Sequence, residues 1–533
     1  MISRPVHPLL LGALPVASMY AAYPGRSNLD ELGTAFLAAL AAAGTIWMVL
    51  SLAYRDATKA ALLASALLLL PVLPDLLHWL EESSLARFGL ARRRYVFGAL
   101  LLAYAALAFW LARTRVSLAR GTAVANIVAA GLVLPPLGAL AAFNVTTLDA
   151  RMRSGPPVPV PTASAVASEK PDIYYFIFDR YGDAATLREN GLDNEPLYRF
   201  LENRGFYVAR ESRANYIKTA LSVSSSLNLA YHDDLARDPG PDSGNHLPLN
   251  YRLQHHVAGT FLKAQGYRYI HAGSWWWPTA TTPLADETIN SYIAVPQPVV
   301  LLLKQPLVAP LVSPFHTALL DHRLQQWERV HRQVTELESL IRRSEPKFVF
   351  VHMLVPHPPT VFDEDGSYVS EDLESRRPGD ENYRRQVVMV NGIIRSLVDR
   401  ILQNAATPPV IILQGDEGPY PKGLEGSDEY RYRRLTPAQL RYRSGILNAY
   451  YLPRGGSALY PSISPVNSFR IVFNSYFGTN LPLLPDRVYR HDSERRPYAL
   501  ADVTADVRGR AELAGPTPAG SPGLSPVRLA SRP

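Results

Sequence analysis

DIYYFIFD, from Asp172 to Asp179, is a short apolar run of β-favouring residues that ends in a carboxylate. Two further runs have this form: FVFVHML at Phe348–Leu354, followed by a Pro-His-Pro turn, and VIIL at Val410–Leu413, followed by QGDEG. A fourth, weaker run covers Tyr267–His271. Continuous apolar runs of this length are typical of strands buried on both faces, as in a parallel sheet covered by helices.

Helical patterns separate these runs, at residues 196–204, 251–265, 322–343 and 382–404. Alternation of strands and helices predicts a doubly wound α/β domain, which we place at residues 171–505. A Pro/Ala-rich linker is expected at 151–170, and a Pro-, Gly- and Ala-rich tail at 506–533 is expected to be disordered.

The first 150 residues predict a membrane anchor. Five apolar segments follow one another there: Leu9–Tyr23, Ala35–Tyr54, Ala60–Leu80, Tyr95–Leu111 and Ala123–Phe143. Most approach the roughly 20 residues that a helix needs to cross a bilayer, so we expect about five transmembrane helices and a multi-pass protein. An odd number of spans with the N-terminus in the cytoplasm places the α/β domain outside the cytoplasm.

Charge and cysteine content exclude several function classes. Residues 1–153 carry 13 Lys and Arg against 7 Asp and Glu, and the rest of the chain carries 41 against 40. The basic excess therefore flanks the apolar segments, and we expect no nucleic-acid partner. The chain has no cysteine, which excludes disulfides, thiolate metal ligands and a cysteine nucleophile.

The stretch SRANYIKTALSVSSSLN, Ser212 to Asn228, is dense in hydroxyl groups. The spacing of Ser222, Ser225 and Leu229 predicts a helix that begins near Thr219. A hydroxyl at a helix N-terminus lies where free N–H groups and the helix dipole favour an anion, which suits a nucleophile for a phosphate or sulfate ester. The alternative is a helix start whose hydroxyls only cap it.

Polar groups follow the predicted strands at Asp179, His357, Asp416 and Glu417. Ligands of such sheets bind at the carboxyl ends of the strands. Two carboxylates and the Thr219 hydroxyl can hold a hard divalent cation, and a metal activates a bound hydroxyl for attack. His357 would bind the anionic oxygens or protonate the leaving group. Singly, each residue also fits a helix cap, a loop histidine or a solvated turn.

These motifs together resemble the sulfatase and alkaline-phosphatase superfamily. The resemblance rests on Asp179 after a strand, Thr219 in its Ser-rich stretch, HMLVPHPP and QGDEGP. It is strongest to the membrane-anchored branch of lipoteichoic acid synthases and phosphoethanolamine transferases, with RSGILNAYYLP (443–453) and SPVNSFRIVFNSYFG (464–478) similar to an uncharacterised sulfatase-like subgroup. That branch implies five N-terminal spans, a bacterial plasma or inner membrane, an exported catalytic domain and transfer of a phospho-group from a lipid donor.

Carried onto this chain, the resemblance implies site roles. Thr219 would be the nucleophile and a metal ligand, with Asp179 and Asp416 as further ligands. Glu417 stands where the family has a histidine, and a carboxylate there favours Mn²⁺, Mg²⁺ or Ca²⁺ over Zn²⁺. The substrate-binding residues would be His357, His352, Asn215, Tyr216 and Trp276. Trp276 lies in the cluster SWWWPT, which fits a glycan or lipid-headgroup site and a hydrophobic core equally well.

We therefore expect a metal-dependent hydrolase or transferase acting on phosphoesters, such as lipid-headgroup phospho-groups, or on sulfate esters at the outer membrane face. The expected partners are membrane lipids and a lipid or glycan substrate. The sulfatase signature C/S-x-P-x-R is missing around Thr219, which favours a phosphoester over a sulfate ester. The alternative, raised by Glu417, is a catalytically inactive relative that serves as a binding or assembly protein of the cell envelope.

Overall fold

A computed structural model of the chain describes residues 4–22, 29–69, 93–153, 159–163, 170–290, 321–422, 424, 432, 435–493 and 495–508. Much of the predicted linker and residues 509–533 of the predicted tail lie outside these ranges. Residues 504–508 of the chain form the short helix α20 (Thr504–Arg508).

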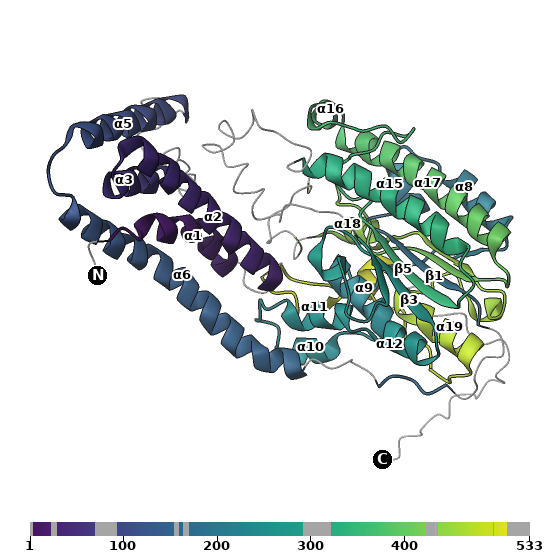
Figure 1. Cartoon of the computed structure of the whole chain (residues 1–533). Coiled ribbons are helices and arrows are strands. Elements are labelled where there is room, and N and C mark those ends of the chain that lie inside the picture. The colour runs from purple at the N-terminus through teal and green to yellow at the C-terminus, as the bar shows by residue number, and fades with distance from the viewer. Residues whose placement is uncertain are drawn as a thin grey trace, which may run out of the picture.

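The α/β domain is built on a seven-stranded sheet with the order β2-β7-β6-β1-β5-β3-β4 (Figure 1). Its strands are β1 (Ile173–Phe178), β2 (Tyr207–Val208), β3 (Arg268–Ala272), β4 (Glu287–Ile289), β5 (Lys347–Met353), β6 (Val410–Gly415) and β7 (Asn448–Tyr451). Strand β1 pairs in parallel with β5 on one side and β6 on the other, and β3 continues the parallel part. All four predicted strands are present, and the parallel arrangement is confirmed for them.

The sheet is mixed, however, because β7 runs antiparallel to β6. Gln414 near the end of β6 pairs with Asn448 at the start of β7. The chain between them therefore stays at the carboxyl edge of the sheet and re-enters the sheet from that edge. The prediction of a doubly wound fold did not include this strand.

Helices cover both faces of the sheet, which confirms the prediction of strands buried on both sides. Alternate residues of β1 point to opposite faces. Tyr174 and Phe176 pack in one core with α8 (Glu195–Glu202), α15 (His322–Ile341) and α17 (Gly379–Asn404). Ile173 and Tyr175 pack in the other core with α9 (Thr219–Asn228), α12 (Val257–Ala264) and α19 (Ser468–Phe477). The two helical layers lie above and below the sheet in Figure 1.

Shorter elements complete the domain. They are α7 (Ala184–Glu189), α10 (Asp233–Arg237), α11 (Leu247–Gln254), the 3₁₀ turns η3 (Trp277–Thr279), η7 (Gly456–Ala458) and η8 (Pro465–Asn467), α16 (Glu371–Arg376), α18 (Pro437–Ser444), and the two-stranded pair β8 (Tyr489–Arg490) and β9 (Ala501–Asp502). Several of them lie at the carboxyl edge of the sheet, where the polar residues collect.

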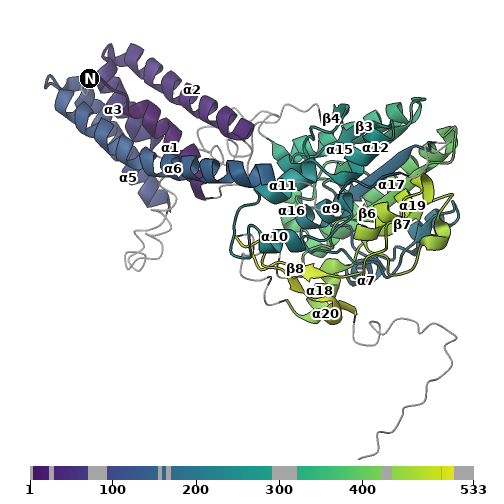
Figure 2. The ribbon, with the colours of Figure 1, turned by 90° about the horizontal axis from the view of Figure 1, so that it is seen from below.

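The N-terminal helices form a separate bundle. They are α1 (His7–Ala22), α2 (Leu29–Tyr54), α3 (Ala57–Leu68), α5 (Arg93–Arg113) and α6 (Ala119–Arg153). Helix α6 runs from this bundle to the α/β domain and ends near α10 and α11 (Figures 1 and 2). Of the 18 large apolar side chains that are exposed in the described part of the chain, all but Val160 and Leu483 precede residue 146. An exposed apolar surface of this kind is typical of regions that contact a membrane or another protein.

The number of membrane spans differs from the expectation. Within the described ranges, two helical segments, Leu32–Tyr54 and Ala119–Phe143, are long and apolar enough to cross a membrane, and not about five. Helix α1 has only 16 residues and contains Pro15. Two arginines occupy the first turn of α5, so its apolar part is limited to Gly98–Arg113. The end of the third apolar segment lies outside the described residues.

Candidate active site

The carboxyl ends of β1, β5 and β6 bring two carboxylates and an imidazole together. Asp179 follows β1 and Asp416 follows β6, while His352 lies within β5 opposite Ile177. All three side chains are buried, and each has a potential ligand atom within 4.8 Å of those of the other two. The Asp179 Oδ2–His352 Nε2 distance is 3.3 Å. The sequence analysis did not predict His352 as a partner of the two aspartates.

Helix α9 begins at Thr219, as the sequence predicted. The whole helix is buried, and Thr219 is 9% exposed. One turn later, Ser222 Oγ donates a 2.6 Å hydrogen bond to the backbone oxygen of Asp416. This bond fixes the N-terminal turn of α9 against the end of β6, so Thr219 lies beside the acidic group.

Electrostatics differ between the two aspartates. Burial raises the pKa of Asp416, and the Asp179 and Glu417 carboxylates raise it further, whereas the Arg180 N–H and the Thr219 hydroxyl oppose the rise. For Asp179, burial also raises the pKa, but His357, His352 and Arg180 outweigh it and hold the pKa well below its usual range. A cation between the two carboxylates would remove the repulsion that keeps the pKa of Asp416 high.

The donor atoms fit a divalent metal ion. The buried atoms without a hydrogen-bond partner in the described part of the chain include four that lie on candidate ligands: Asp179 Oδ1, His352 Nε2, Asp416 Oδ2 and Glu417 Oε2. Buried polar atoms without partners are rare in folded proteins. His352 Nδ1 lies 2.7 Å from Thr279 Oγ1, and with Nδ1–H donating to that oxygen, the Nε2 lone pair faces Asp179. A second residue that orients the imidazole in this way is typical of histidine metal ligands.

Glu417, predicted as a metal ligand, is held in an ion pair with a buried arginine. Arg443 Nη2 donates to Glu417 Oε1 at 2.5 Å, and both side chains are 1% exposed. The backbone at Gly418 lies close to the backbone at Tyr442, since a Cβ on Gly418 would lie 2.3 Å from the Tyr442 oxygen. Glu417 is not part of the group of three ligand atoms within 4.8 Å, and its role as a ligand stays a prediction.

Two arginine side chains and Tyr420 form the cationic side of the site. The guanidinium carbons of Arg180 and Arg443 lie 3.9 and 4.5 Å from the centre of the Tyr420 ring. Burial raises the pKa of Tyr420, but Arg180, Arg443 and Lys218 lower it more, so it lies below its usual value. This shift indicates a positive potential beside the three carboxylates.

His357 lies in the loop after β5 and is half-buried. Its Nδ1 is within hydrogen-bond distance of the Pro358 carbonyl oxygen. That oxygen can only accept, so Nδ1 carries the proton and Nε2 is an acceptor. Burial and the nearby Arg180 lower the pKa of His357 to about 3, against the opposing effect of Asp179.

Asn215 and Tyr216 do not face this group. The Asn215 amide bonds Ser464 Oγ, Tyr231 Oη, the Arg487 carbonyl and the Val466 N–H. Tyr216 is fully buried, accepts from the His232 N–H at 2.8 Å and stacks on Tyr489. These contacts tie the loop before α9 to the C-terminal segment. A substrate-binding role for either residue stays a prediction.

Trp276 lies closer to the site. Its ring centre is 6.2 Å from that of His352 in an edge-on arrangement, and the side chain also packs against apolar residues of two cores. The structure therefore supports a core role and places the ring beside a candidate ligand.

The sequence analysis did not single out Arg180, Arg443 and Thr279 as site residues. Arg180 had a local signal, since a basic residue directly follows the strand-end aspartate. Thr279 had none, because it lies 73 residues before His352 in the chain.

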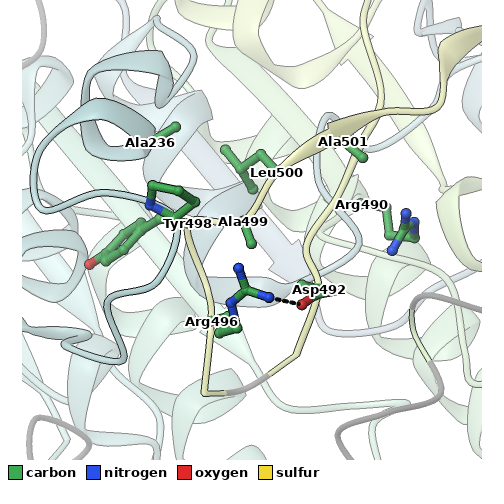
Figure 3. Close-up of a pocket in the computed structure, with 9 residues that line it drawn as sticks. Ala236, Arg490, Asp492, Arg496, Tyr498, Ala499, Leu500 and Ala501 are labelled. Atoms are coloured by element: carbon green, nitrogen blue, oxygen red, sulfur yellow. Dashed lines mark hydrogen bonds and ion pairs between the residues drawn. The ribbon is translucent and has the colours of Figure 1, made fainter.

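A cavity of about 510 Å³ lies elsewhere, beside the β8–β9 pair (Figure 3). Its lining includes Arg490, Arg496, Tyr498 and Leu500, and Arg496 pairs with Asp492. A second cavity, of about 370 Å³, lies beside β2 and the end of α8, and its lining includes Glu202, Phe206 and Arg210. Neither is lined by a predicted site residue, so size alone does not mark the candidate active site.

No family model matches the chain, and no curated protein sequence matches it. Similar solved structures include the C-terminal periplasmic domain of EcEptC from Escherichia coli in complex with Zn, at 11% identity and a TM-score of 0.43, covering 65% of this chain and 96% of that one. The integral membrane phosphoethanolamine transferase EptA from Neisseria meningitidis matches at 13% identity and a TM-score of 0.38, covering 88% and 93%.

A putative sulfatase from Bacteroides fragilis matches at 12% identity and a TM-score of 0.36, covering 62% of this chain and 82% of that one. The descriptions of these last two proteins name a phosphoethanolamine transferase and a putative sulfatase, respectively.

Proposed function

We propose that the chain is a metal-dependent enzyme that transfers or hydrolyses phospho-groups at the outer face of a membrane, with Thr219 as the nucleophile. The observation that carries the proposal is the convergence of Asp179, His352 and Asp416 within 4.8 Å, where α9 starts with Thr219. The apolar surface of the N-terminal helices supports a site close to lipid, so a phospholipid headgroup is the favoured donor.

Each residue of the site has its own proposed role. Asp179, His352, Asp416 and the Thr219 hydroxyl would hold the cation, and the metal would activate that hydroxyl and neutralise phosphoryl charge. An imidazole among the ligands admits Zn²⁺ or Mn²⁺ more readily than Mg²⁺ or Ca²⁺, which shifts the expectation drawn from Glu417 alone.

The proposed reaction has two steps. Thr219 Oγ1 forms a bond to phosphorus while the bond from phosphorus to the alcohol of the donor breaks, and the alcohol leaves with the threonine proton. The oxygen of water or of a second alcohol then bonds to phosphorus while the bond from phosphorus to Thr219 Oγ1 breaks, and Thr219 takes the proton of the attacking hydroxyl. His357 Nε2, an acceptor, would orient the incoming hydroxyl.

The test uses the full chain in detergent, assayed on a nitrophenyl phosphodiester, a phosphomonoester and a sulfate ester with Zn²⁺, Mn²⁺, Mg²⁺ or Ca²⁺. We expect phosphodiester turnover that a chelator abolishes and that Thr219→Val lowers at least about a hundredfold. Thr219→Ser keeps a hydroxyl and should retain part of the activity. Mass spectrometry of the wild type should detect a phospho-group on Thr219 after incubation with phospholipid vesicles.

Two outcomes would overturn the proposal. Equal turnover by the wild type and Thr219→Val would exclude this nucleophile. No turnover with any metal, together with no metal-induced rise in the midpoint of thermal unfolding, would favour the inactive binding or assembly protein. A metal that binds only the folded state, at a concentration of about a hundred times its Kd, adds about 2.7 kcal/mol to the free energy of unfolding. The lack of a rise in the unfolding midpoint is therefore measurable.

A further inference from the structure

Arg180 has a backbone conformation that non-glycine residues rarely adopt. Its φ is +64°, in the left-handed region. Such a conformation persists where the surroundings hold it, and it is enriched at functional sites. Here the Arg180 N–H donates to Asp416 Oδ1 at 2.9 Å, and its carbonyl accepts from Tyr383 Oη at 2.8 Å. The backbone is thus fixed between a candidate metal ligand and α17.

The Nε of Arg180 is buried without a hydrogen-bond partner in the described part of the chain. The residue is 7% exposed, and within the described residues its Nε makes no hydrogen bond. Nε lies 3.6 Å from Glu417 Oε1 and 4.0 Å from Asp179 Oδ1, distances of ion pairs and not of hydrogen bonds. Burying a cation whose N–H donor has no acceptor costs free energy, so the burial of Arg180 needs an explanation.

The ion pairs with Glu417 and Asp179 do not satisfy the Arg180 Nε donor, because both distances exceed that of a hydrogen bond and Glu417 has a nearer partner. Arg443 Nη2 donates to Glu417 Oε1, the same oxygen that Arg180 approaches, at the shorter distance of 2.5 Å. The Tyr420 ring, 3.9 Å from the guanidinium carbon, holds the Arg180 plane in place without using its donors. Its Nε–H group therefore remains available to a ligand.

The charge balance indicates the sign of that ligand. Asp179, Asp416 and Glu417 are matched by three cationic side chains, Arg180, Arg443 and Lys218, that act on the same group. Counted over these six described side chains alone, a divalent cation would add an excess of two positive charges. A planar guanidinium with paired N–H donors matches the oxygens of a tetrahedral phosphoryl group.

We propose that Arg180, oriented by Tyr420, binds the non-bridging oxygens of the phospho-group that Thr219 attacks. This rests on the proposed function and adds a substrate-binding residue to it. Arg180 would supply the second positive charge at phosphorus, beside the single metal site formed by Asp179, His352 and Asp416. The reacting bonds stay those of the two steps given above.

Calorimetry of the full chain with Mn²⁺ and then inorganic phosphate tests this directly. Arg180→Gln also places a non-glycine residue in the left-handed backbone conformation, but it removes the charge. Arg180→Lys keeps the charge and removes the planar guanidinium with its paired N–H donors. We expect Mn²⁺ affinity to change less than about twofold, and phosphate affinity to fall 10- to 100-fold in Arg180→Gln and less in Arg180→Lys. For the phosphodiester, KM should rise and kcat should fall in Arg180→Gln.

A matched control separates the charge of Arg180 from general packing. Arg204→Gln removes an arginine that also stacks on an aromatic ring, Phe200, and pairs with Asp399 of α17. This variant should bind phosphate like the wild type.

The outcomes distinguish this inference from the proposed function. Equal phosphate binding by the wild type and Arg180→Gln, with Thr219→Val inactive, overturns the role of Arg180 and leaves the function standing. Phosphate binding that depends on Arg180 in a protein without turnover supports the anion site and overturns the enzyme. Loss of phosphate binding in Arg204→Gln as well would show a general loss of structure and overturn the inference.

Discussion

Single residues in the site have roles that depend on which neighbour holds them. His352 has its Nδ1 held by Thr279 and its Nε2 directed at Asp179, an arrangement that suits a metal ligand. Glu417 has one oxygen held by Arg443 and the other without a partner in the described part of the chain. The carboxylate that the sequence marked as a ligand is thus partly used in an ion pair, while a histidine assigned to substrate is adjacent to the acidic group.

The buried Arg443–Glu417 pair should be sensitive to loss of one partner. Arg443→Met leaves the buried Glu417 without its hydrogen-bonded partner, which costs about 3–5 kcal/mol, so the midpoint of thermal unfolding should fall clearly. Arg210→Met is the control, because its bridges to Glu195 and Glu202 are largely exposed and such pairs contribute at most about 1 kcal/mol. Tryptophan fluorescence of the full chain in detergent measures the unfolding midpoints of both variants. Equal midpoints for the two variants would contradict a structural role for the pair.

At the scale of elements, the site depends on how α9 is attached to the sheet. The helix starts at Thr219, and Ser222 bonds the backbone of Asp416 one turn later. Ser225, on the next turn, only returns a hydrogen bond to the Ser222 carbonyl within the helix. The two serines therefore offer a comparison between a bond that positions the nucleophile and one that does not.

Ser222→Ala should lower turnover about tenfold, because a small displacement of Thr219 from Asp416 reduces the rate steeply. Its stability should fall by only about 1 kcal/mol, the usual contribution of one hydrogen bond. Ser225→Ala should leave kcat unchanged with a similar loss of stability. Steady-state kinetics and thermal unfolding of the two variants decide the matter, and equal kcat in both would mean that the bond to Asp416 does not position Thr219.

At the scale of the whole molecule, the core of the α/β domain contains histidines that are buried and neutral. Burial, the largest cause in each case, lowers the pKa of His232 and His256 to about 3 and that of His271 to about 4. They lie at the start of α10, before α12 and on β3, so they belong to one side of the sheet. In the unfolded chain their pKa values return to about 6.5.

Stability of the domain should therefore fall as pH drops below about 6.5. Between that value and about 4 the unfolded chain binds protons that the folded chain does not, so each histidine removes roughly 1.4 kcal/mol per pH unit. Thermal unfolding midpoints of the full chain at pH 7.5, 6.5, 6.0 and 5.5 would show a flat region followed by a decline. His256→Gln should make the decline shallower. A midpoint that stays constant to pH 5.5 would contradict the prediction.

The sequence by itself determined the four apolar strands, three of the four helices between them, the strand-end positions of Asp179 and Asp416, and the start of a helix at Thr219. The helix predicted at 251–265 is two helices, α11 and α12. These features follow from local hydrophobic pattern and helix-start chemistry, which neighbours in the chain control. The antiparallel β7 and the short apolar helices of the N-terminal bundle departed from that pattern.

Only the tertiary structure decided which side chains meet. The order of strands places His352 of β5 beside β1, and the return of the chain at the carboxyl edge places Arg443 against Glu417, 26 residues away. The left-handed Arg180 and the link from Thr279 to His352 likewise depend on contacts between distant segments. Strand order and edge connections are set by the packing of both helical layers on the sheet, and no local stretch of sequence encodes them.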